Sequence, residues 1–260
     1  MKITIAYFTG TGSTKKVAQT IFEEFKNQNK SCTLIDITKN NAMSIEPGDL
    51  LVMLSPVHAF RLVIFTEKWI KSLPPVLNSK KVAIISVSAG GETSPNTACR
   101  LQSKKLLTKK GYTIVYEDMF LMPSNFGTPS TSEEIKQMSD ILPIKSKNFV
   151  TDILSGNIKI LKPKFQDKII SSLGKAEHYG AHIFGKMLKS NESCNGCGIC
   201  TANCPVKNIN LKDNKLDFGF NCIWCMKCIY SCPQKAIYPS FLKSVVLKDG
   251  FVDYSKWDTK

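Results

Sequence analysis

Residues 194–205 read CNGCGICTANCP, and residues 222–233 read CIWCMKCIYSCP. Both stretches follow one pattern, C-x-x-C-x-x-C-x-x-x-C-P, and the second begins 28 residues after the first. The similarity continues past the cysteines, because Lys207 matches Lys235 and Ile209 matches Ile237 at the same offset. Two copies of one small half-module are the simplest interpretation. Thiols crowded at this spacing indicate a site for metal held through sulfur.

The repeated pattern resembles that of the bacterial two-cluster ferredoxins, whose iron–sulfur cubes are bound by cysteine thiolates. In that family the fourth cysteine of each run ligates the other cluster. The resemblance implies a first [4Fe–4S] cluster on Cys194, Cys197, Cys200 and Cys232. It implies a second cluster on Cys222, Cys225, Cys228 and Cys204. One-electron transfer is the chemistry that such clusters supply.

Two other interpretations of the eight cysteines stay open at this point. Zinc is one, although zinc ligands usually come as two C-x-x-C pairs from separate knuckles. Disulfide bonds are the other, although nothing else in the sequence indicates an oxidising compartment.

The N-terminal part alternates short apolar runs with helical patterns. The runs KITIAYF, CTLIDI, DLLVMLS, KVAIISV and YTIVYEDM predict strands, and residues 14–28, 63–72 and 95–110 predict helices. Buried strands that alternate with helices predict a parallel α/β sheet. Five strands suit the flavodoxin-like order 2-1-3-4-5, in which ligands bind outside the carboxyl ends of the strands.

The first predicted strand ends in a loop of glycines and small hydroxyl residues. Residues 9–14 read TGTGST, and a helix is predicted directly after them. Backbone N–H groups and a helix N-terminus favour phosphate at such a loop. The loop is not a dinucleotide fingerprint, because Lys15 stands at the third glycine position, and it lacks the Walker A spacing. A plain strand–helix turn with a threonine cap is the alternative.

Several loops of this part resemble those of flavodoxins. TGTGST is similar to the flavodoxin phosphate loop, commonly T/S-G-T-G-N-T, with Ser13 in place of the usual asparagine. Residues 55–61 (SPVHAFR) and 88–91 (SAGG) resemble the two loops that contact the isoalloxazine ring. Residues 122–126 (MPSNF) look like a loop of the flavodoxin–ferredoxin fusion proteins of anaerobes, whose domain order the whole chain resembles.

The resemblance implies a bound FMN. Its phosphate would be held by Thr9, Gly10, Thr11, Gly12, Ser13 and Thr14. Its ring would be contacted by Pro56, Val57, His58, Ala59 and Phe60 on one side, and by Ser88, Ala89, Gly90 and Gly91 on the other. Only His58 and Phe60 offer an aromatic ring for stacking. An ordinary loop histidine and a core phenylalanine are the alternatives for these two residues.

We predict four parts along the chain. Residues 1–155 form a flavodoxin-like FMN domain, and 156–190 form a basic connector in which Phe165, Ile169, Ile170 and Leu173 make an apolar helix face that packs on the domains. Residues 191–240 form a small α+β two-cluster ferredoxin domain, with a hairpin in 208–220 around Asp213-Asn214. Residues 241–260 form a tail that docks back, through residues such as Tyr254 and Trp257. His178 and His182, four residues apart, are assigned a structural role.

Charge and hydropathy bound the partners. The 260 residues carry a formal net charge of +14, and two oxidised clusters and a flavin phosphate would reduce it to about +8. A basic protein favours acidic redox partners, whereas dispersed lysines without an aromatic platform disfavour nucleic acid. The sequence has no run of 18 apolar residues, so it predicts no membrane-spanning segment. The N-terminus reads as a strand instead of a signal peptide, so we expect a cytoplasmic protein.

The expected function is electron transfer between the FMN and the two clusters, and onward to protein partners. The sequence shows no catalytic constellation, so an electron carrier is favoured over an enzyme. The alternatives are a flavin-dependent reductase of a small acceptor fed by the clusters, and an FMN-free redox sensor or binding module. Lys207, Lys227 and Lys235 lie beside cluster ligands, and their charge should raise the cluster potentials.

Overall fold

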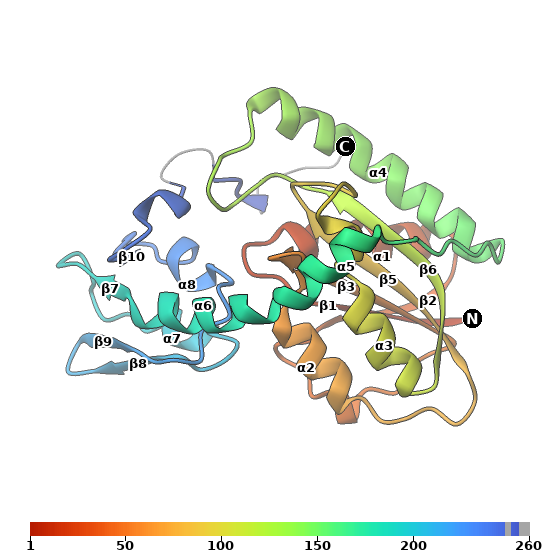
Figure 1. Cartoon of the computed structure of the whole chain (residues 1–260), viewed down its shortest axis with the longest axis horizontal. Helices are drawn as coiled ribbons and strands as arrows, with labels where there is room; N and C mark the ends of the chain where they lie inside the picture. Colours follow the sequence, from red (N-terminus) through yellow and green to blue (C-terminus); the bar gives the residue numbers. More distant parts are fainter. Residues whose placement is uncertain (248–250, 255–260) are drawn as a thin grey trace. The chain divides into compact units, whose positions relative to one another are not determined.

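The computed structural model describes residues 1–247 and 251–254, without the side chains of Lys175, Glu177 and His178 (Figure 1). The predicted roles of Trp257 and of the His178 side chain therefore lie outside the described residues. The chain divides into two compact units. The first comprises Met1–Pro123, Ser130–Gly174 and the chain from Val252 onward, and the second comprises Ser124–Pro129 and Lys175–Phe251.

The first unit is built on a six-stranded sheet. Its strands are β1 (Lys2–Tyr7), β2 (Ser31–Asp36), β3 (Leu50–His58), β4 (Arg61–Leu62), β5 (Lys80–Ser88) and β6 (Tyr112–Leu121). Five strands run parallel in the order β2-β1-β3-β5-β6, which confirms the predicted order 2-1-3-4-5 of the long strands. The short β4, which the sequence analysis missed, pairs antiparallel with β3.

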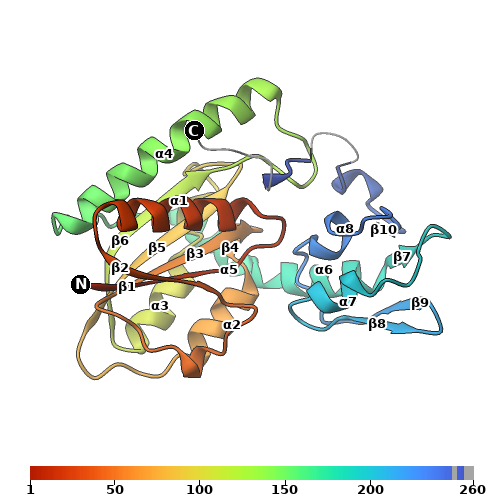
Figure 2. The ribbon, with the colours of Figure 1, turned by 180° about the vertical axis from the view of Figure 1, so that it is seen from behind.

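Helices cover both faces of this sheet. Helices α1 (Ser13–Asn27) and α4 (Ser132–Leu154) pack side by side on one face, and α2 (Ile64–Ser72) and α3 (Leu101–Lys109) cover the other (Figure 2). Short 3-10 turns lie at η1 (Ala42–Ser44) and η2 (Asn96–Ala98). The core lies between the sheet and helices α1 and α4. It is formed by apolar side chains such as Ile5, Val52 and Ile85 of the strands and Ile21 and Phe149 of the helices.

Helix α5 (Phe165–Leu173) confirms the predicted helix, but its predicted packing face was wrong. Phe165, Ile169 and Leu173 are exposed, and the buried positions are Asp167 and Ser171. The cause is a polar anchor. The Asp167 carboxylate accepts hydrogen bonds from the hydroxyls of Ser94 and Thr97, which also lower its pKa, and Ser171 donates to the carbonyl of Ala98.

The second unit is a small α+β fold. Its elements are α6 (Lys175–Lys186), β7 (Leu188–Ser190), α7 (Ile199–Asn203), β8 (Ile209–Lys212), β9 (Lys215–Phe218), α8 (Lys227–Tyr230), β10 (Ile237–Pro239) and η3 (Lys243–Val245). Strands β7 and β10 pair antiparallel, and β8 and β9 form the predicted hairpin. Asp213 and Asn214 both have positive φ, of 50° and 55°, as a tight hairpin turn requires.

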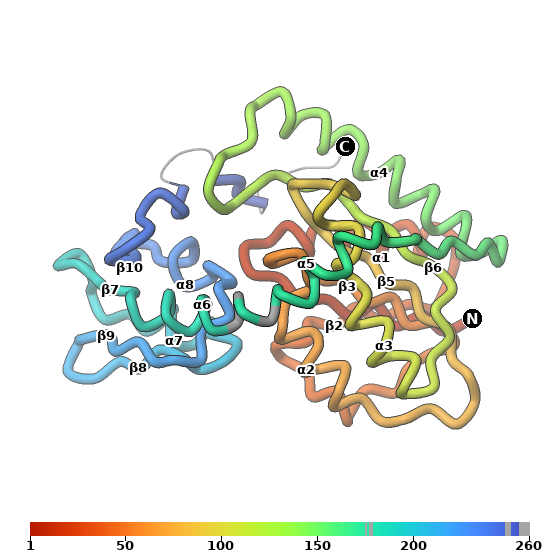
Figure 3. The backbone as a smooth tube through the Cα atoms, in the orientation of Figure 1, coloured from red at the N-terminus to blue at the C-terminus, as the bar shows by residue number. Residues whose placement is uncertain are grey.

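Residues 124–129 belong to the second unit although they lie between β6 and α4 in the chain (Figure 3). The backbone N–H of Gly127 donates to the carbonyl of Val245 at 2.9 Å. The Tyr230 hydroxyl donates to the carbonyl of Asn125 at 3.0 Å. These contacts make the segment a structural part of that unit. None of the helices in the described part of the chain has the length and apolar character that a membrane crossing requires.

Candidate cofactor sites

The eight motif cysteines surround two separate cavities in the second unit. The first cavity is lined by Cys194, Cys197, Cys200 and Cys232. The second is lined by Cys204, Cys222, Cys225 and Cys228. Each cavity thus takes three cysteines from one motif and the fourth from the other, which is the grouping that the sequence resemblance implied. Ligation by these cysteines stays a prediction.

The two motif loops share a backbone conformation. Gly196 and Trp224, which are 28 positions apart, have φ of 70° and 58°. Gly198 and Met226, at the same offset, have φ of 73° and 59° and directly precede α7 and α8. Left-handed backbone at both positions turns each loop around its cavity. The repeat in the sequence is therefore also a repeat in the fold.

The residues after each crossing cysteine repeat as well. Lys207 and Lys235 have φ of 49° and 47°. In consequence the N–H of Asn208 donates to Sγ of Cys204 at 3.2 Å, and the N–H of Ala236 donates to Sγ of Cys232 at 3.4 Å. Such donors stabilise negative charge on sulfur, which thiolate ligands and reduced clusters carry.

Burial changes the acidity of the thiols of the second motif. It raises the pKa of Cys222 to about 11 and that of Cys225 to about 12, and it raises the pKa of Cys228 well above its usual value. Without metal these thiols are protonated at neutral pH, so metal binding has to displace protons. Four sulfur donors around one cavity are the soft ligand set that iron–sulfur clusters require. The residues present therefore fit two [4Fe–4S] clusters.

Aromatic side chains cover the loop of the second motif. The Trp224 ring stacks on Phe184 with 5.0 Å between ring centroids, and the Phe126 ring meets it edge-on at 5.4 Å. The sequence analysis gave Trp224 no role. Its position between Cys222 and Cys225 was the signal that could have shown it.

In the first unit, the loop 9–14 joins β1 to α1 and is suited to a phosphate. Gly12 precedes the helix with φ of 110°, and its N–H donates to Oγ1 of Thr9 at 3.0 Å. The first N–H groups of a helix lack partners within the helix and attract anions. Thr14 is fully buried, and its hydroxyl has no hydrogen-bond partner in the described structure. A buried hydroxyl of this kind at a helix start fits a phosphate oxygen.

The first predicted ring loop is a hairpin. Strand β3 continues to His58, turns through Ala59 and Phe60 with φ of 33° and 65°, and returns as β4. Phe60 stands at the turn and is exposed, so it is not a core residue. Arg61 is buried and forms two hydrogen bonds of 2.9 Å to the carboxylate of Glu67 in α2.

The second predicted ring loop follows β5. The N–H of Gly90 donates to Oγ of Ser88, and the side chain of Asn96 donates to the carbonyl of Gly91. Strands β1, β3 and β5 are parallel neighbours, so the loop 9–14 and the two ring loops extend from the same edge of the sheet. That edge, between β1 and β3, is where the connections reverse direction, and ligands bind at such points.

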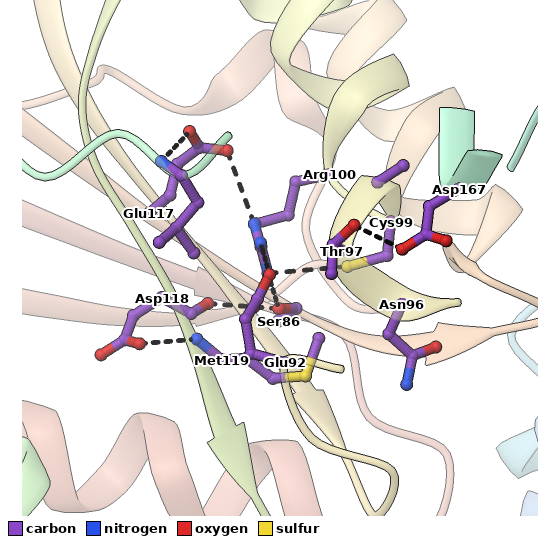
Figure 4. Close-up of polar contacts among 12 residues, drawn as sticks. Ser86, Glu92, Asn96, Thr97, Cys99, Arg100, Glu117, Asp118, Met119 and Asp167 are labelled. Atoms are coloured by element: carbon purple, nitrogen blue, oxygen red, sulfur yellow. Dashed lines mark hydrogen bonds and ion pairs between the residues drawn. The ribbon is translucent and has the colours of Figure 1, made fainter. Parts of the chain in front are cut away.

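A buried arginine contacts residues on both sides of the second ring loop (Figure 4). Arg100 is 1% exposed, donates to the Ser86 hydroxyl, pairs with Glu92 at 2.5 Å, and faces Glu117 at 3.5 Å. Breaking one partner from such a buried pair costs about 3–5 kcal/mol. Sequence reasoning missed it, although the chain has only two arginines among its 35 basic residues. Both arginines are buried in ion pairs beside the predicted ring loops.

Comparison with known proteins agrees with this arrangement. Residues 4–117 match the flavodoxin domain family, and residues 193–237 match the 4Fe-4S dicluster domain family. The fold and the cysteine cavities thus define an electron-transfer protein. The chain thus combines a segment similar to flavodoxin domains with a segment similar to 4Fe-4S dicluster domains, and these two matches imply FMN and [4Fe–4S] clusters as cofactors.

Solved flavodoxins are similar to the first unit. Oxidised Flavodoxin 2 from Bacillus cereus is 19% identical, covers 60% of this chain and 99% of its own, and has a TM-score of 0.44. The two-electron reduced flavodoxin of Megasphaera elsdenii is 20% identical, covers 56% of this chain and 98% of its own, and has a TM-score of 0.41. A search of curated proteins finds no match.

Proposed function

We propose that this protein passes electrons between an FMN in the first unit and two [4Fe–4S] clusters in the second, and on to protein partners. The observation that carries the proposal is the grouping of the eight cysteines into two four-thiol cavities, in a chain that also has a flavodoxin domain. FMN can exchange one or two electrons, whereas each cluster exchanges one. A chain with both can therefore divide electron pairs into single electrons.

The protein groups have distinct tasks in this function. Residues 9–14 would bind the FMN phosphate, and residues 56–60 and 88–91 would hold the ring. The two cysteine sets would hold the clusters, and the backbone donors at Asn208 and Ala236 would stabilise charge on sulfur. The partners are proposed to be acidic proteins, because Lys207 and Lys235 are exposed beside the crossing cysteines. The proposed location is the cytoplasm, where thiols are kept reduced.

The first test is a count of cofactors. Protein purified without oxygen should contain about eight iron, about eight acid-labile sulfide and about one FMN per chain. Rapid reduction of the flavin should then be followed by reduction of the clusters at a rate that does not depend on protein concentration. Full clusters without any flavin, even after FMN is added, would contradict the proposal. So would a flavin and clusters that exchange no electrons.

A further inference from the structure

The C-terminal part of the chain places one aromatic residue on the loop 9–14 of the first unit. Tyr254 is 9% exposed and belongs to the same core cluster as Val17 and Ile21 of α1. Val252, two residues earlier, packs against that cluster as well. Tyr254 is therefore an integral residue of the first unit, although the cysteine motifs separate it from the rest of that unit in sequence.

The Tyr254 ring lies directly on Gly12. A Cβ atom added to Gly12 would lie 3.0 Å from Cδ2 of Tyr254 and 3.4 Å from its Cβ. Gly12 also has a backbone φ of 110°, which residues other than glycine rarely adopt. The glycine thus permits both the left-handed turn before α1 and the close approach of the ring.

The Tyr254 hydroxyl is bonded on two sides. It donates to the carbonyl of Pro123, just after β6, at 3.3 Å. It also forms a hydrogen bond with the Ser13 side chain, which lowers its pKa against the larger raising effect of burial. Ring and hydroxyl together fix Gly12 and Ser13 against the end of the sheet. Next to them, the buried Thr14 hydroxyl has no partner in the described structure and is available to a phosphate oxygen.

We propose that Tyr254 is a positioning residue of the FMN phosphate site, because it braces Gly12 and Ser13 in the conformation that accepts a phosphate group. The proposal rests on the assignment of residues 9–14 to the FMN phosphate under Proposed function. It predicts a specific pattern of affinity. Loss of the brace should weaken the binding of FMN and leave the binding of riboflavin, which has the same ring but no phosphate, unchanged.

The experiment compares FMN with riboflavin on the full-length chain. Flavin-free protein with its clusters intact is titrated without oxygen, and binding is followed by the quenching of flavin fluorescence. Tyr254→Phe removes only the hydroxyl, and Tyr254→Ala removes the ring as well. Tyr116→Phe is the matched control, since it removes a buried hydroxyl that donates to Asp152 elsewhere in the same unit.

We expect FMN affinity to fall by about fivefold in Tyr254→Phe and by about tenfold or more in Tyr254→Ala. Riboflavin affinity should stay constant, and Tyr116→Phe should change neither affinity. An equal loss for FMN and riboflavin would overturn the proposal and show a general role in the fold. Unchanged FMN affinity, or tighter FMN binding to Tyr254→Ala, would also overturn it. If the unaltered chain binds no FMN at all, the proposed function itself fails.

Discussion

Gly196 and Gly198 in the first cysteine motif occupy the same backbone positions as Trp224 and Met226 in the second. The two pairs adopt the same left-handed conformation, yet the first loop is open and the second is covered. Cys197 is exposed in the first loop, whereas aromatic rings stack around Trp224 in the second. The halves therefore differ in what their left-handed residues carry, and the middle cysteine is exposed in the first loop but only partly exposed in the second.

The energetic terms explain why bulky residues are tolerated in the second loop. A left-handed conformation costs a residue other than glycine about 1–2 kcal/mol. Truncation of a buried methionine such as Met226 typically costs about 2–5 kcal/mol, and the half-buried Trp224 loses less than a fully buried tryptophan would. Packing thus outweighs strain at Met226 and, through the stacked rings, offsets it at Trp224, while glycine avoids the strain in the first loop.

The crossing cysteines offer the most drastic change to this comparison. Cys232→Ser should remove the cluster of the first loop, although Cys232 belongs to the second motif, and Cys204→Ser should remove the cluster of the second loop. Each variant should keep about four of about eight iron atoms per chain. Iron analysis and electron paramagnetic resonance of the reduced protein measure this. The crossed ligand sets would be refuted if Cys232→Ser removed the cluster of the second loop and Cys204→Ser removed the cluster of the first.

Trp224→Gly would make the second loop resemble the first. We expect a net destabilisation of about 1–2 kcal/mol, because the half-buried ring loses about 3 kcal/mol of packing and about 1–2 kcal/mol of strain is relieved. The clusters' visible absorbance should disappear at a lower temperature and bleach faster in air. The reduction potential of the second cluster should rise as water reaches it. Trp224→Phe, which keeps an aromatic ring, is the matched variant, and equal behaviour of the two variants would show that the ring has no covering role.

Charge distinguishes the loops at one more matched pair, Ile199 and Lys227. Burial raises the pKa of the Cys225 thiol, and Lys227 lowers it, mainly through a hydrogen bond from its backbone and to a smaller extent through its charge. Lys227→Ile should therefore lower the potential of the second cluster by tens of millivolts, and Ile199→Lys should raise the potential of the first. Redox titration followed by electron paramagnetic resonance measures both. Two unchanged potentials would mean that solvent screens the lysine completely.

The smallest effects are expected at the glycines of the first loop. A Cβ on Gly198 would meet nothing closer than Oγ1 of Thr201 at 3.6 Å, so Gly198→Ala should cost only the strain, about 1 kcal/mol. A Cβ on Gly196 would lie 2.7 Å from Oδ1 of Asn214, so Gly196→Ala should cost more. Thermal unfolding of the two variants gives the order. If Gly198→Ala were the more damaging change, steric contact would not be the factor that separates them.

Features with a strong local signal were predictable from the sequence. The long strands of the sheet follow from their apolar runs, and the hairpin follows from Asp213-Asn214. Features set by distant partners were not. Helix α5 turns Asp167 inward because its hydroxyl partners Ser94 and Thr97 come from another part of the chain. Strand β4 is too short to show a period. The places of Arg100 and Tyr254 follow from tertiary contacts that no local pattern encodes.

Residues 124–129 make the second unit depend on a segment that lies within the sequence of the first unit. The gene encodes them between β6 and α4, inside the flavodoxin part, yet they supply the Phe126 ring to Trp224 and a carbonyl to Tyr230 in the dicluster part. A gene segment that carried only residues 175–251 into another protein would leave this support behind. Residues 175–251 alone would therefore lack part of the contacts that support the dicluster part. Recombination that separates them from residues 124–129 should be selected against.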